Sequence, residues 1–202
     1  MPPRFVARQL SRPTGVVGRL VGWLMNRTNA AMNVFAVQQL DLQPTDRVLE
    51  IGFGGGVTLP SLLKASSFVG GVDRSADVIS RTKARFTNAV RAGRADFRVG
   101  TVEALPFEAG SFNKVCTVNT VYFWTSLKQG FAEIHRVLSS GGRVVVGFLP
   151  KEGMDRMDMP TDIFTTRSPD SVIAALGETG FRDVRCERPT PETSWIVVVA
   201  TR

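Results

Sequence analysis

The stretch VLEIGFGGG, residues 48–56, decides the fold that we expect for this chain. It begins as an apolar run typical of a buried strand and ends in a glycine loop. Glycines let the backbone come close to a ligand, and the helix expected after the loop presents free N–H groups at its start. The dinucleotide pattern G-x-G-x-x-G fails here, because position 57 is valine where that pattern requires glycine or alanine. The loop has the form E-x-G-x-G-x-G instead, starting from Glu50.

Outward from the glycine loop, apolar runs alternate with helical patterns. This alternation predicts strands at residues 47–51, 68–72, 95–99, 113–118, 143–148, 184–188 and 195–200. Helices are predicted at residues 57–65, 75–90, 126–138 and 168–179, and a mobile loop or cover at residues 151–166. The linker between the last two strands is too short for a helical crossover, so these strands should be antiparallel. The expected fold is α/β: a doubly wound, Rossmann-like, seven-stranded and mostly parallel sheet, with one antiparallel strand near the C-terminus and helices on both faces.

Charge is distributed unevenly along the 202 residues, a length that suits a single domain. The net charge is +7 and the first acidic residue is Asp41, whereas five arginines interleaved with apolar residues precede it. We therefore expect residues 1–40 to form a basic helical extension or lid and residues 41–202 to form the main domain. Such an extension can pack on the domain, lie on anionic lipid, attract an anionic substrate or bind nucleic acid, and these alternatives stay open.

Several classes of protein are disfavoured by the composition. Cys116 and Cys186 lie in apolar, strand-like runs, so we expect two buried, reduced thiols and neither a disulfide framework nor a metal site. No stretch reaches the roughly 18–20 apolar residues that span a bilayer, and no secretory signal is recognisable. We expect a cytoplasmic protein, with contact to the inner face of a membrane as an alternative.

Asp73 ends the second expected strand, and a carboxylate at that place can accept hydrogen bonds from both hydroxyls of a ribose. Two more segments follow: EALPF at residues 103–107 with GSFN at 110–113, and EIHRVLSSGG at 133–142. Together with the glycine loop and GVD at 71–73, they resemble the motifs of class I S-adenosylmethionine-dependent methyltransferases, in particular the small UbiE-like, methyltransferase type 11 members. The resemblance covers about residues 40–149, with Asn113 where the family has aspartate.

This resemblance implies S-adenosylmethionine as the cofactor and S-adenosylhomocysteine as the product. Gly52 and Gly54 would face the methionine part of the cofactor, and Asp73 would bind its ribose. Arg74 would lie beside the adenine, either stacked on it or turned to solvent. The family commonly has an acidic residue at the position of Thr101, so the adenine end departs from the pattern. In full, the implied cofactor contacts are Glu50, Gly52, Gly54, Asp73, Arg74, Thr101, Val102, Glu103 and Asn119.

The residues after the fourth expected strand, 119–124, are expected to rim the acceptor pocket. Tyr122, the only tyrosine, is the candidate catalytic residue, which would position or deprotonate the acceptor. The alternative is that Tyr122 and Trp124 are pocket wall or core. His135, the only histidine, lies in the helix that leads to the fifth strand, and we expect it away from the cleft.

The sulfonium of the implied cofactor is already an activated methyl donor, so in-line SN2 transfer needs mainly alignment and desolvation. The sequence therefore predicts methyl transfer to a small-molecule or lipid-like acceptor in a lidded pocket. One alternative is a peripheral membrane methyltransferase acting on a phospholipid or quinone, and another is a non-catalytic S-adenosylmethionine-binding interaction module. Nucleic acid is disfavoured as a partner, because no aromatic and basic stripe or added recognition domain is visible. The acceptor atom and the oligomeric state stay open.

Overall fold

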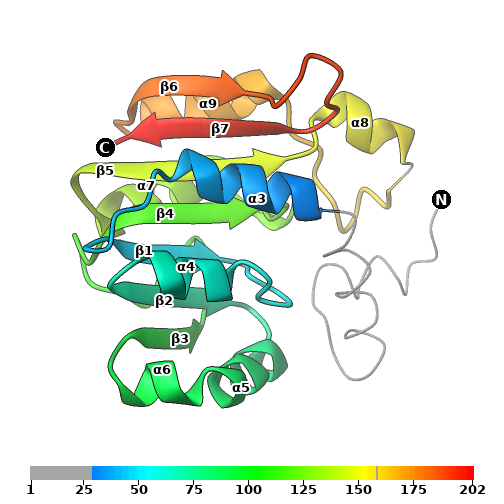
Figure 1. Cartoon of the computed structure of the whole chain (residues 1–202). Coiled ribbons are helices and arrows are strands. Elements are labelled where there is room, and N and C mark those ends of the chain that lie inside the picture. The colour runs from blue at the N-terminus through cyan, green and yellow to red at the C-terminus, as the bar shows by residue number, and fades with distance from the viewer. Residues whose placement is uncertain (1–28, 158) are drawn as a thin grey trace.

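A computed structural model describes residues 29–157 and 159–202 as a seven-stranded sheet with helices on both faces (Figure 1). The predicted basic extension falls largely on residues 1–28, which lie outside the described residues. No helix among the described residues is both long and apolar enough to span a bilayer. The strands are β1 (Arg47–Ile51), β2 (Phe68–Asp73), β3 (Ala95–Val99), β4 (Phe112–Val118), β5 (Leu138–Phe148), β6 (Arg182–Glu187) and β7 (Ile196–Thr201).

The order of the strands across the sheet is β3-β2-β1-β4-β5-β7-β6. β1 to β5 run parallel, and β7 runs antiparallel to both of its neighbours, β5 and β6. The predicted sheet, with a single reversed strand near its C-terminal edge, is therefore confirmed. The strand order reverses between β1 and β4, and ligands of doubly wound sheets bind at the carboxyl ends of the strands beside such a reversal.

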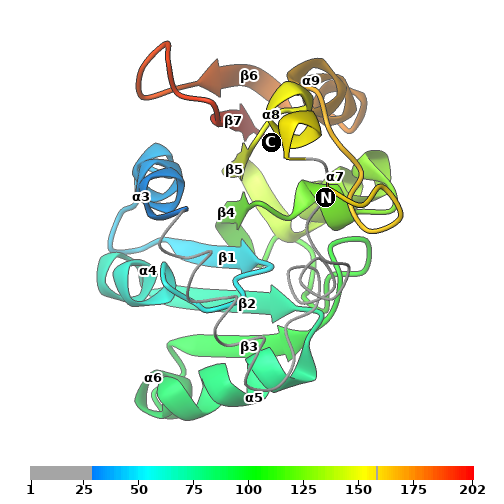
Figure 2. The ribbon, with the colours of Figure 1, turned by 90° about the vertical axis from the view of Figure 1, so that its right-hand side faces the viewer.

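Two layers of helices cover the sheet, and their bounds are α3 (Ala30–Gln39), α4 (Leu59–Ala65), α5 (Ala76–Arg85), α6 (Thr87–Arg91), η1 (a 3₁₀ turn, Val121–Phe123), α7 (Leu127–Val137), α8 (Lys151–Arg156) and α9 (Pro169–Glu178). α3, α4 and α5 share one core with the sheet, and α7 and α9 share the other. Figure 2 shows α3 and α7 on opposite sides of the strands.

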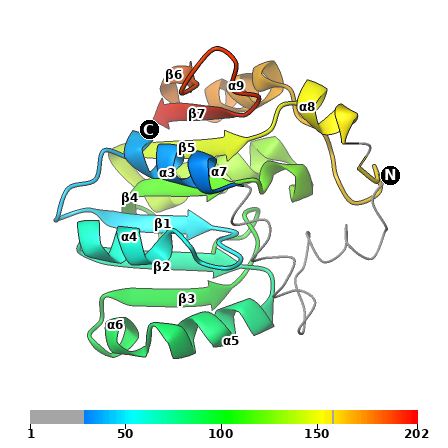
Figure 3. The same ribbon diagram turned by 45° about the vertical axis from the view of Figure 1, so that its right-hand side comes forward.

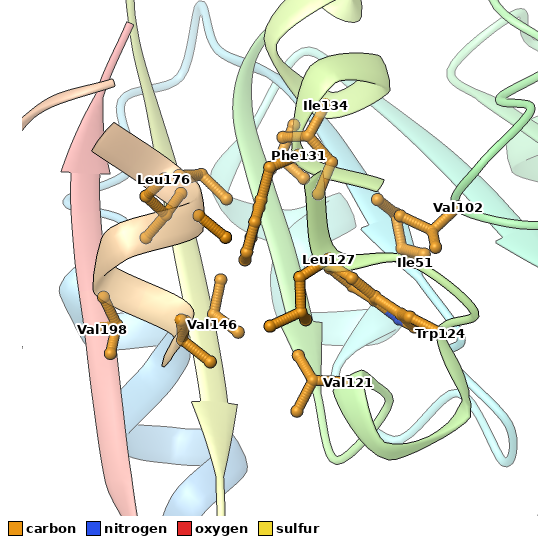
Figure 4. Packing of buried hydrophobic residues seen from close by; sticks show 14 of the residues in the cluster. Ile51, Val102, Val121, Trp124, Leu127, Phe131, Ile134, Val146, Leu176 and Val198 are labelled. Carbon is orange, nitrogen blue, oxygen red and sulfur yellow. The ribbon is translucent and has the colours of Figure 1, made fainter. Parts of the chain in front are cut away.

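Each strand divides its side chains between the two cores. Val48 of β1 belongs to the core under α3 and α4, and the next residue, Leu49, belongs to the core under α7 and α9, as the alternation of a strand requires. Figure 4 shows the second core, which contains Phe131 of α7 together with Val146 and Val198 of the sheet. The apolar runs of the sequence are thus buried on both faces, as expected for a parallel sheet.

Serine side chains begin three of the helices. Ser75 Oγ accepts the Val78 N–H over 3.4 Å at the start of α5, as an N-cap serine does. Ser126 and Ser168 cap α7 and α9 in the same way, each over 3.2 Å. Because Ser75 starts α5 two residues after β2 ends, the chain turns sharply at Asp73 and holds that residue at the edge of the sheet.

Two predicted element boundaries are wrong. The helix expected at residues 75–90 is two helices, because Phe86 leaves helical geometry (φ −109°, ψ 29°) and packs its ring 6.0 Å from that of Phe97. β5 starts at Leu138, five residues before the strand predicted at residues 143–148. Leu138 pairs with Phe112 of β4, and an irregularity in the register follows, so the strand is longer than its β-branched run.

Two further expectations need correction. The predicted loop at residues 151–166 contains a helix, α8, whose Lys151 and Asp155 form an i,i+4 ion pair at 2.5 Å. Cys116 is buried and unpaired, as expected, but Cys186 is exposed, because β6 is an edge strand whose side chains are only partly covered. Arg185 and Glu187, the charged neighbours of Cys186 in the sequence, fit this edge position.

Asn113, which departs from the family pattern, is explained by its neighbour Asp46. The Asn113 side-chain oxygen accepts the Arg47 N–H over 2.8 Å, and its amide nitrogen donates to Asp46 Oδ1 over 2.6 Å. Asp46 is buried, so it needs donors around its carboxylate. An ionised aspartate at position 113 has no proton to donate, and the amide therefore suits this neighbour better.

Candidate functional site

A cavity opens at the carboxyl ends of β1, β2 and β4, beside the reversal of the strand order. Glu50, which was implied as a cofactor contact, is buried and does not line this cavity. The rim expected at residues 119–124 supplies several lining residues, and Thr125, which no sequence signal marked, extends it. The other eight implied contacts all line the cavity: Gly52, Gly54, Asp73, Arg74, Thr101, Val102, Glu103 and Asn119.

The glycine loop meets the cavity through two residues with left-handed backbone angles. Gly52 (φ +69°) donates its N–H to Val72 O over 2.7 Å, and a side chain at this position would collide with Thr120. Gly54 (φ +49°) has no atom within 4 Å of the point where a side chain would begin. Backbone conformation favours glycine at both positions, and the open space in front of Gly54 is room that a ligand can fill.

Asp73 fixes the glycine loop and faces the same cavity. Its Oδ2 accepts the Gly54 N–H over 3.0 Å, and its Oδ1 accepts the Ser75 N–H over 2.9 Å. Only 6% of the residue is exposed, and burial raises its pKa, although the two N–H groups and the charge of Arg74 oppose the rise. Each carboxylate oxygen keeps a further lone pair, so the side chain can accept both hydroxyls of a ribose.

Glu50 is the second buried carboxyl group at this edge of the sheet. Its Oε1 accepts a hydrogen bond from the Thr58 hydroxyl, and its Oε2 has no partner among the described residues. Burial raises the pKa of Glu50 to about 7, the Thr58 bond lowers it, and the negative charge of Asp73 raises it further. A buried carboxylate without partners is costly, so a cationic ligand group close to Glu50 would stabilise its ionised form.

The side of the cavity near β3 is where the chain departs from the family pattern. Thr101 is exposed and forms an isolated bridge with Ala104, which turns the chain at the rim. Glu103, the nearest acid, accepts the Thr125 N–H at its Oε1 over 2.8 Å, so its carboxylate already ties two parts of the rim together. Arg74 is exposed at the mouth of the cavity. This side therefore offers fewer fixed polar groups than the side around Asp73.

Glu133 and Arg136 of α7 hold the EALPF segment in place. Glu133 Oε2 accepts the Leu105 N–H over 2.9 Å, and Arg136 pairs with Glu133 Oε1 at 2.7 Å. Arg136 also donates to Phe107 O over 2.8 Å. The resemblance to the family identified these two segments without assigning a contact between them; the structure shows that α7 positions the segment next to the cavity.

Tyr122 does not line the cavity, and its hydroxyl is engaged elsewhere. The hydroxyl accepts the Leu149 N–H over 2.5 Å and lies 3.2 Å from two acceptors, Leu149 O and Asn119 Oδ1. Burial raises the pKa of Tyr122 far above its ordinary value. This geometry argues against the predicted deprotonation of an acceptor by Tyr122, because a buried phenol with a raised pKa keeps its proton. Tyr122 is buried in the core under α7 and α9, which fits the alternative that it is a core residue, and positioning of the acceptor through Asn119 stays a prediction.

Phe123 and Trp124 form an aromatic wall on the β4 side of the cavity. The Phe123 ring lies 4.9 Å from the ring of Phe164, which belongs to the segment after α8, so part of the predicted cover packs against this wall. Trp124 Nε1 donates to Thr120 Oγ1 over 3.2 Å. Figure 4 shows the indole beside Ile51 and Val102, which lie at the ends of β1 and of the loop after β3.

His135 lies away from the cavity, as expected. Its ring packs edge-on against Phe181 at 5.3 Å and closes over Gly180. Burial and the charge of Arg202 lower the pKa of His135, which favours the neutral ring. Among residues 29–157 and 159–202, no three histidine, cysteine or acidic side chains gather in a way that could hold a metal ion.

Known proteins resemble this chain in sequence. A family model described as a methyltransferase domain matches residues 49–146. The chain is 28% identical over 167 residues to the uncharacterized methyltransferase YdaC of Bacillus subtilis (strain 168), which covers 82% of this chain and 87% of YdaC. It is 31% identical over 115 residues to the ubiquinone/menaquinone biosynthesis C-methyltransferase UbiE of Geotalea daltonii, which covers 55% of this chain and 49% of UbiE.

Solved structures share the fold. The geranyl diphosphate C-methyltransferase of Streptomyces coelicolor A3(2), solved with Mg²⁺, geranyl-S-thiolodiphosphate and S-adenosyl-L-homocysteine, superposes with a TM-score of 0.73. The match covers 87% of this chain and 77% of that protein, at 18% sequence identity. At this level of identity the likeness concerns the arrangement of strands and helices.

Proposed function

We propose a function from one premise: the chain belongs to the class I S-adenosylmethionine-dependent methyltransferase superfamily. S-adenosylmethionine is its cofactor and supplies a methyl group already activated by the sulfonium. In our proposal the acceptor is a small, apolar or lipid-like molecule. The observation that carries this choice is the aromatic wall of Phe123 and Trp124 on the β4 side of the cavity.

We place the cofactor along the β1 and β2 side of the cavity. Asp73 binds the ribose, because its two oxygens are held by backbone N–H groups and keep lone pairs on the cavity side. Gly54 leaves room for the methionine part, Gly52 lines the cavity beside it, and the unpartnered Oε2 of Glu50 offsets positive charge there. The adenine then lies towards Arg74 and the loop after β3, where we assign contacts to Thr101, Val102 and Glu103; Asn119 closes the methionine end.

The acceptor side joins two aromatic rings to neutral polar side chains and contains no evident base. Its lining residues, Asn119, Thr120, Phe123, Trp124 and Thr125, include no carboxylate, histidine or lysine among the described residues. Alignment and exclusion of water are therefore the contributions that these side chains can make. An acceptor whose nucleophile is competent without deprotonation by the protein, and whose body is apolar, suits such a surface.

A prenylated aromatic ring is the narrower candidate within this class. The UbiE relative is named for C-methylation in ubiquinone and menaquinone biosynthesis, although the match spans about half of that protein. Flat rings pack well on other aromatic rings, and Phe123 offers a partly exposed one. A quinol is therefore the first acceptor that we would test.

The test measures S-adenosylhomocysteine release by the full chain with prenylated quinols, hydrophobic phenols and long-chain amines, each against a polar analogue. We expect turnover with the apolar acceptors. Phe123→Ala should raise the acceptor KM at least about tenfold and leave the Kd for S-adenosylmethionine within about twofold, because truncating a large buried ring costs more than 1 kcal/mol at a binding surface. Phe68→Ala removes a half-buried ring at the opposite end of β2 and is the matched control.

Two outcomes would contradict the proposal. Turnover confined to the polar analogues would show that the aromatic wall does not select the acceptor. Cofactor binding without turnover on any acceptor would instead favour a non-catalytic S-adenosylmethionine-binding module.

A further inference from the structure

Positive charge is concentrated in one short part of the described chain. Residues 74–94 contain six basic side chains and one acidic side chain, Asp77, for a net charge of +5. The rest of the sequence from residue 29 onward has 14 basic and 17 acidic residues, so it is slightly acidic. We call this part the α5–α6 basic face; its basic residues are Arg74, Arg81, Lys83, Arg85, Arg91 and Arg94.

The α5–α6 basic face is fully presented to solvent. α5 turns Val78, Ile79 and Thr82 towards the sheet, and all six basic residues are exposed. In the part of the chain that the structure describes, none of the six forms an ion pair with an acidic side chain. Figure 3 shows α5 and α6 lying along β3, at the end of the molecule opposite β6 and α9.

Local structure explains only part of this charge. Arg94 donates to Ser66 O over 2.9 Å, and Arg85 donates to Gly55 O over 3.4 Å, so both serve the fold. Lys83 and Arg85 lie in the last turn of α5, where cations are favourable. Arg81 and Arg85 are four residues apart on one helix, however, and like charges at this spacing are destabilising. The basic face therefore carries more charge than α5 and α6 need.

Exposed aliphatic residues adjoin the basic face at the mouth of the cavity. Val99 ends β3, pairs in register with Asp73, and is 51% exposed. Val57 follows the glycine loop that Asp73 holds, and is 42% exposed. Arg74, the first residue of the basic face, lines the cavity itself. Arg74, Val57 and Val99 thus lie at the carboxyl ends of the strands beside the cavity, and the rest of the basic face extends from there towards the start of β3.

We propose that the α5–α6 basic face docks on the anionic surface of a lipid bilayer, with Val57 and Val99 entering its interfacial layer. Lysine and arginine close to anionic lipid contribute favourably, and exposed aliphatic side chains gain by entering the interface. A nucleic acid would bind the charged groups but would leave the valines unused. Base stacking would need an exposed aromatic ring, and residues 74–94 present none. Phe86, the one aromatic residue there, is half-buried beneath Arg85, whose guanidinium lies 4.9 Å from the ring.

Docking in this orientation has a consequence for the acceptor. Arg74 connects the basic face to the cavity mouth, so the mouth would face the bilayer. A lipid-like acceptor could then enter the cavity without crossing water. This consequence rests on the proposed function, whereas the docking itself does not.

The experiment measures partition of the full chain onto vesicles of phosphatidylcholine alone and of phosphatidylcholine with 30% phosphatidylglycerol. The triple variant Arg81→Glu, Lys83→Glu, Arg91→Glu reverses the charge at three positions of the basic face, none of which lines the cavity. Arg182→Glu, Arg185→Glu, Arg188→Glu makes the same change of charge on exposed residues at and after β6, at the other edge of the sheet. We expect the first variant to lose at least about tenfold in partition onto anionic vesicles and the second to lose less than threefold.

The proposal is overturned by equal losses in the two variants, by no preference of the wild type for anionic vesicles, or by unchanged partition of the first variant. Loss of binding to a single-stranded oligonucleotide with vesicle binding intact would assign the face to nucleic acid instead. S-adenosylhomocysteine release with a detergent-solubilised acceptor separates the two proposals. If release persists in the first variant and its vesicle binding equals that of the wild type, the docking proposal fails and the proposed function stands. If no acceptor is methylated but vesicle binding is lost in the first variant, the docking proposal stands and the proposed function fails.

Discussion

The two sides of the cavity are formed in different ways, one mainly by the backbone and the other by aromatic side chains. On the side of β1 and β2, the cavity is shaped by backbone conformation and by a carboxylate that holds it: Gly52 and Gly54 have positive φ angles, and Asp73 binds the Gly54 N–H. On the side of β4, it is shaped by the aromatic side chains of Phe123 and Trp124. The first kind of surface accepts few residue types at each position, whereas the second requires only size and apolarity.

The largest expected effect is the loss of cofactor affinity when the carboxylate of Asp73, on the first side, is removed. Asp73→Ala deletes the two oxygens that we propose as acceptors for the ribose, and it removes the acceptor of the Gly54 and Ser75 N–H groups. Hydrogen bonds to a charged group contribute about 1.5–3 kcal/mol each, so loss of two should raise the Kd for S-adenosylmethionine by at least about 100-fold in calorimetry. Asp77→Ala, at an exposed acid on the first turn of α5, is the control and should bind normally. Normal binding by both variants would remove Asp73 from the cofactor site.

The next effect concerns the pH dependence of stability, through Glu50. Its pKa is about 7 in the folded protein and 4.5 when exposed, so between these values the folded state holds a proton that the unfolded chain has lost. The free energy of unfolding should therefore fall as pH rises from about 4.5 to about 7, by roughly 3 kcal/mol from this group. Denaturant titrations of Glu50→Gln should lack that component, since glutamine stays neutral. A variant with the pH dependence of the wild type would mean that Glu50 titrates normally.

A matched pair of glycines separates backbone strain from occupation of the cavity. Gly54 and Gly110 both have positive φ and no neighbour within 4 Å of an added Cβ, but only Gly54 lines the cavity. Alanine at either position should lower the free energy of unfolding by about 1–2 kcal/mol, because left-handed backbone is unfavourable for side chains. Only Gly54→Ala should also weaken cofactor binding, by about tenfold or more. Equal binding by the two variants would show that the space before Gly54 is not used.

The smallest effect is expected on the second side, at Tyr122. Tyr122→Phe keeps the ring but removes the hydroxyl that accepts the Leu149 N–H and faces Asn119. We expect kcat to fall about five- to tenfold, with the cofactor Kd unchanged, since one neutral hydrogen bond contributes about 1 kcal/mol. The pH–rate profile should keep its shape. Loss of one limb of that profile, with a fall of a thousandfold, would restore Tyr122 as a base.

The same contrast explains what the sequence could predict. All seven strands and the single reversed strand follow from apolar runs and from the length of the last linker. Eight implied cofactor contacts gather in one cavity, because each lies at the end of a parallel strand or in the loop that follows it, and these strands end at the same edge. The local sequence pattern is sufficient to predict a feature wherever the backbone conformation at a position allows few residue types.

Features that depend on distant neighbours could not be predicted. The break at Phe86 follows from packing on Phe97 of β3, and the early start of β5 follows from pairing with Phe112. Tyr122 is the clearest case, because its hydroxyl is taken by Leu149, 27 residues away in the chain. An aromatic residue near a pocket has the same appearance in sequence whether its polar group faces a substrate or the backbone.

The amide of Asn113 has a consequence for how this sequence can change. Asn113 bonds to Asp46 with a donor that aspartate lacks, so returning position 113 to the residue of the family pattern would set two carboxylates against each other. That substitution should be tolerated only together with Asp46→Asn. Positions 46 and 113 are therefore epistatic: the intermediate with two aspartates is unfavourable, whereas the intermediate with two asparagines keeps a donor and an acceptor, so the order of the two changes matters.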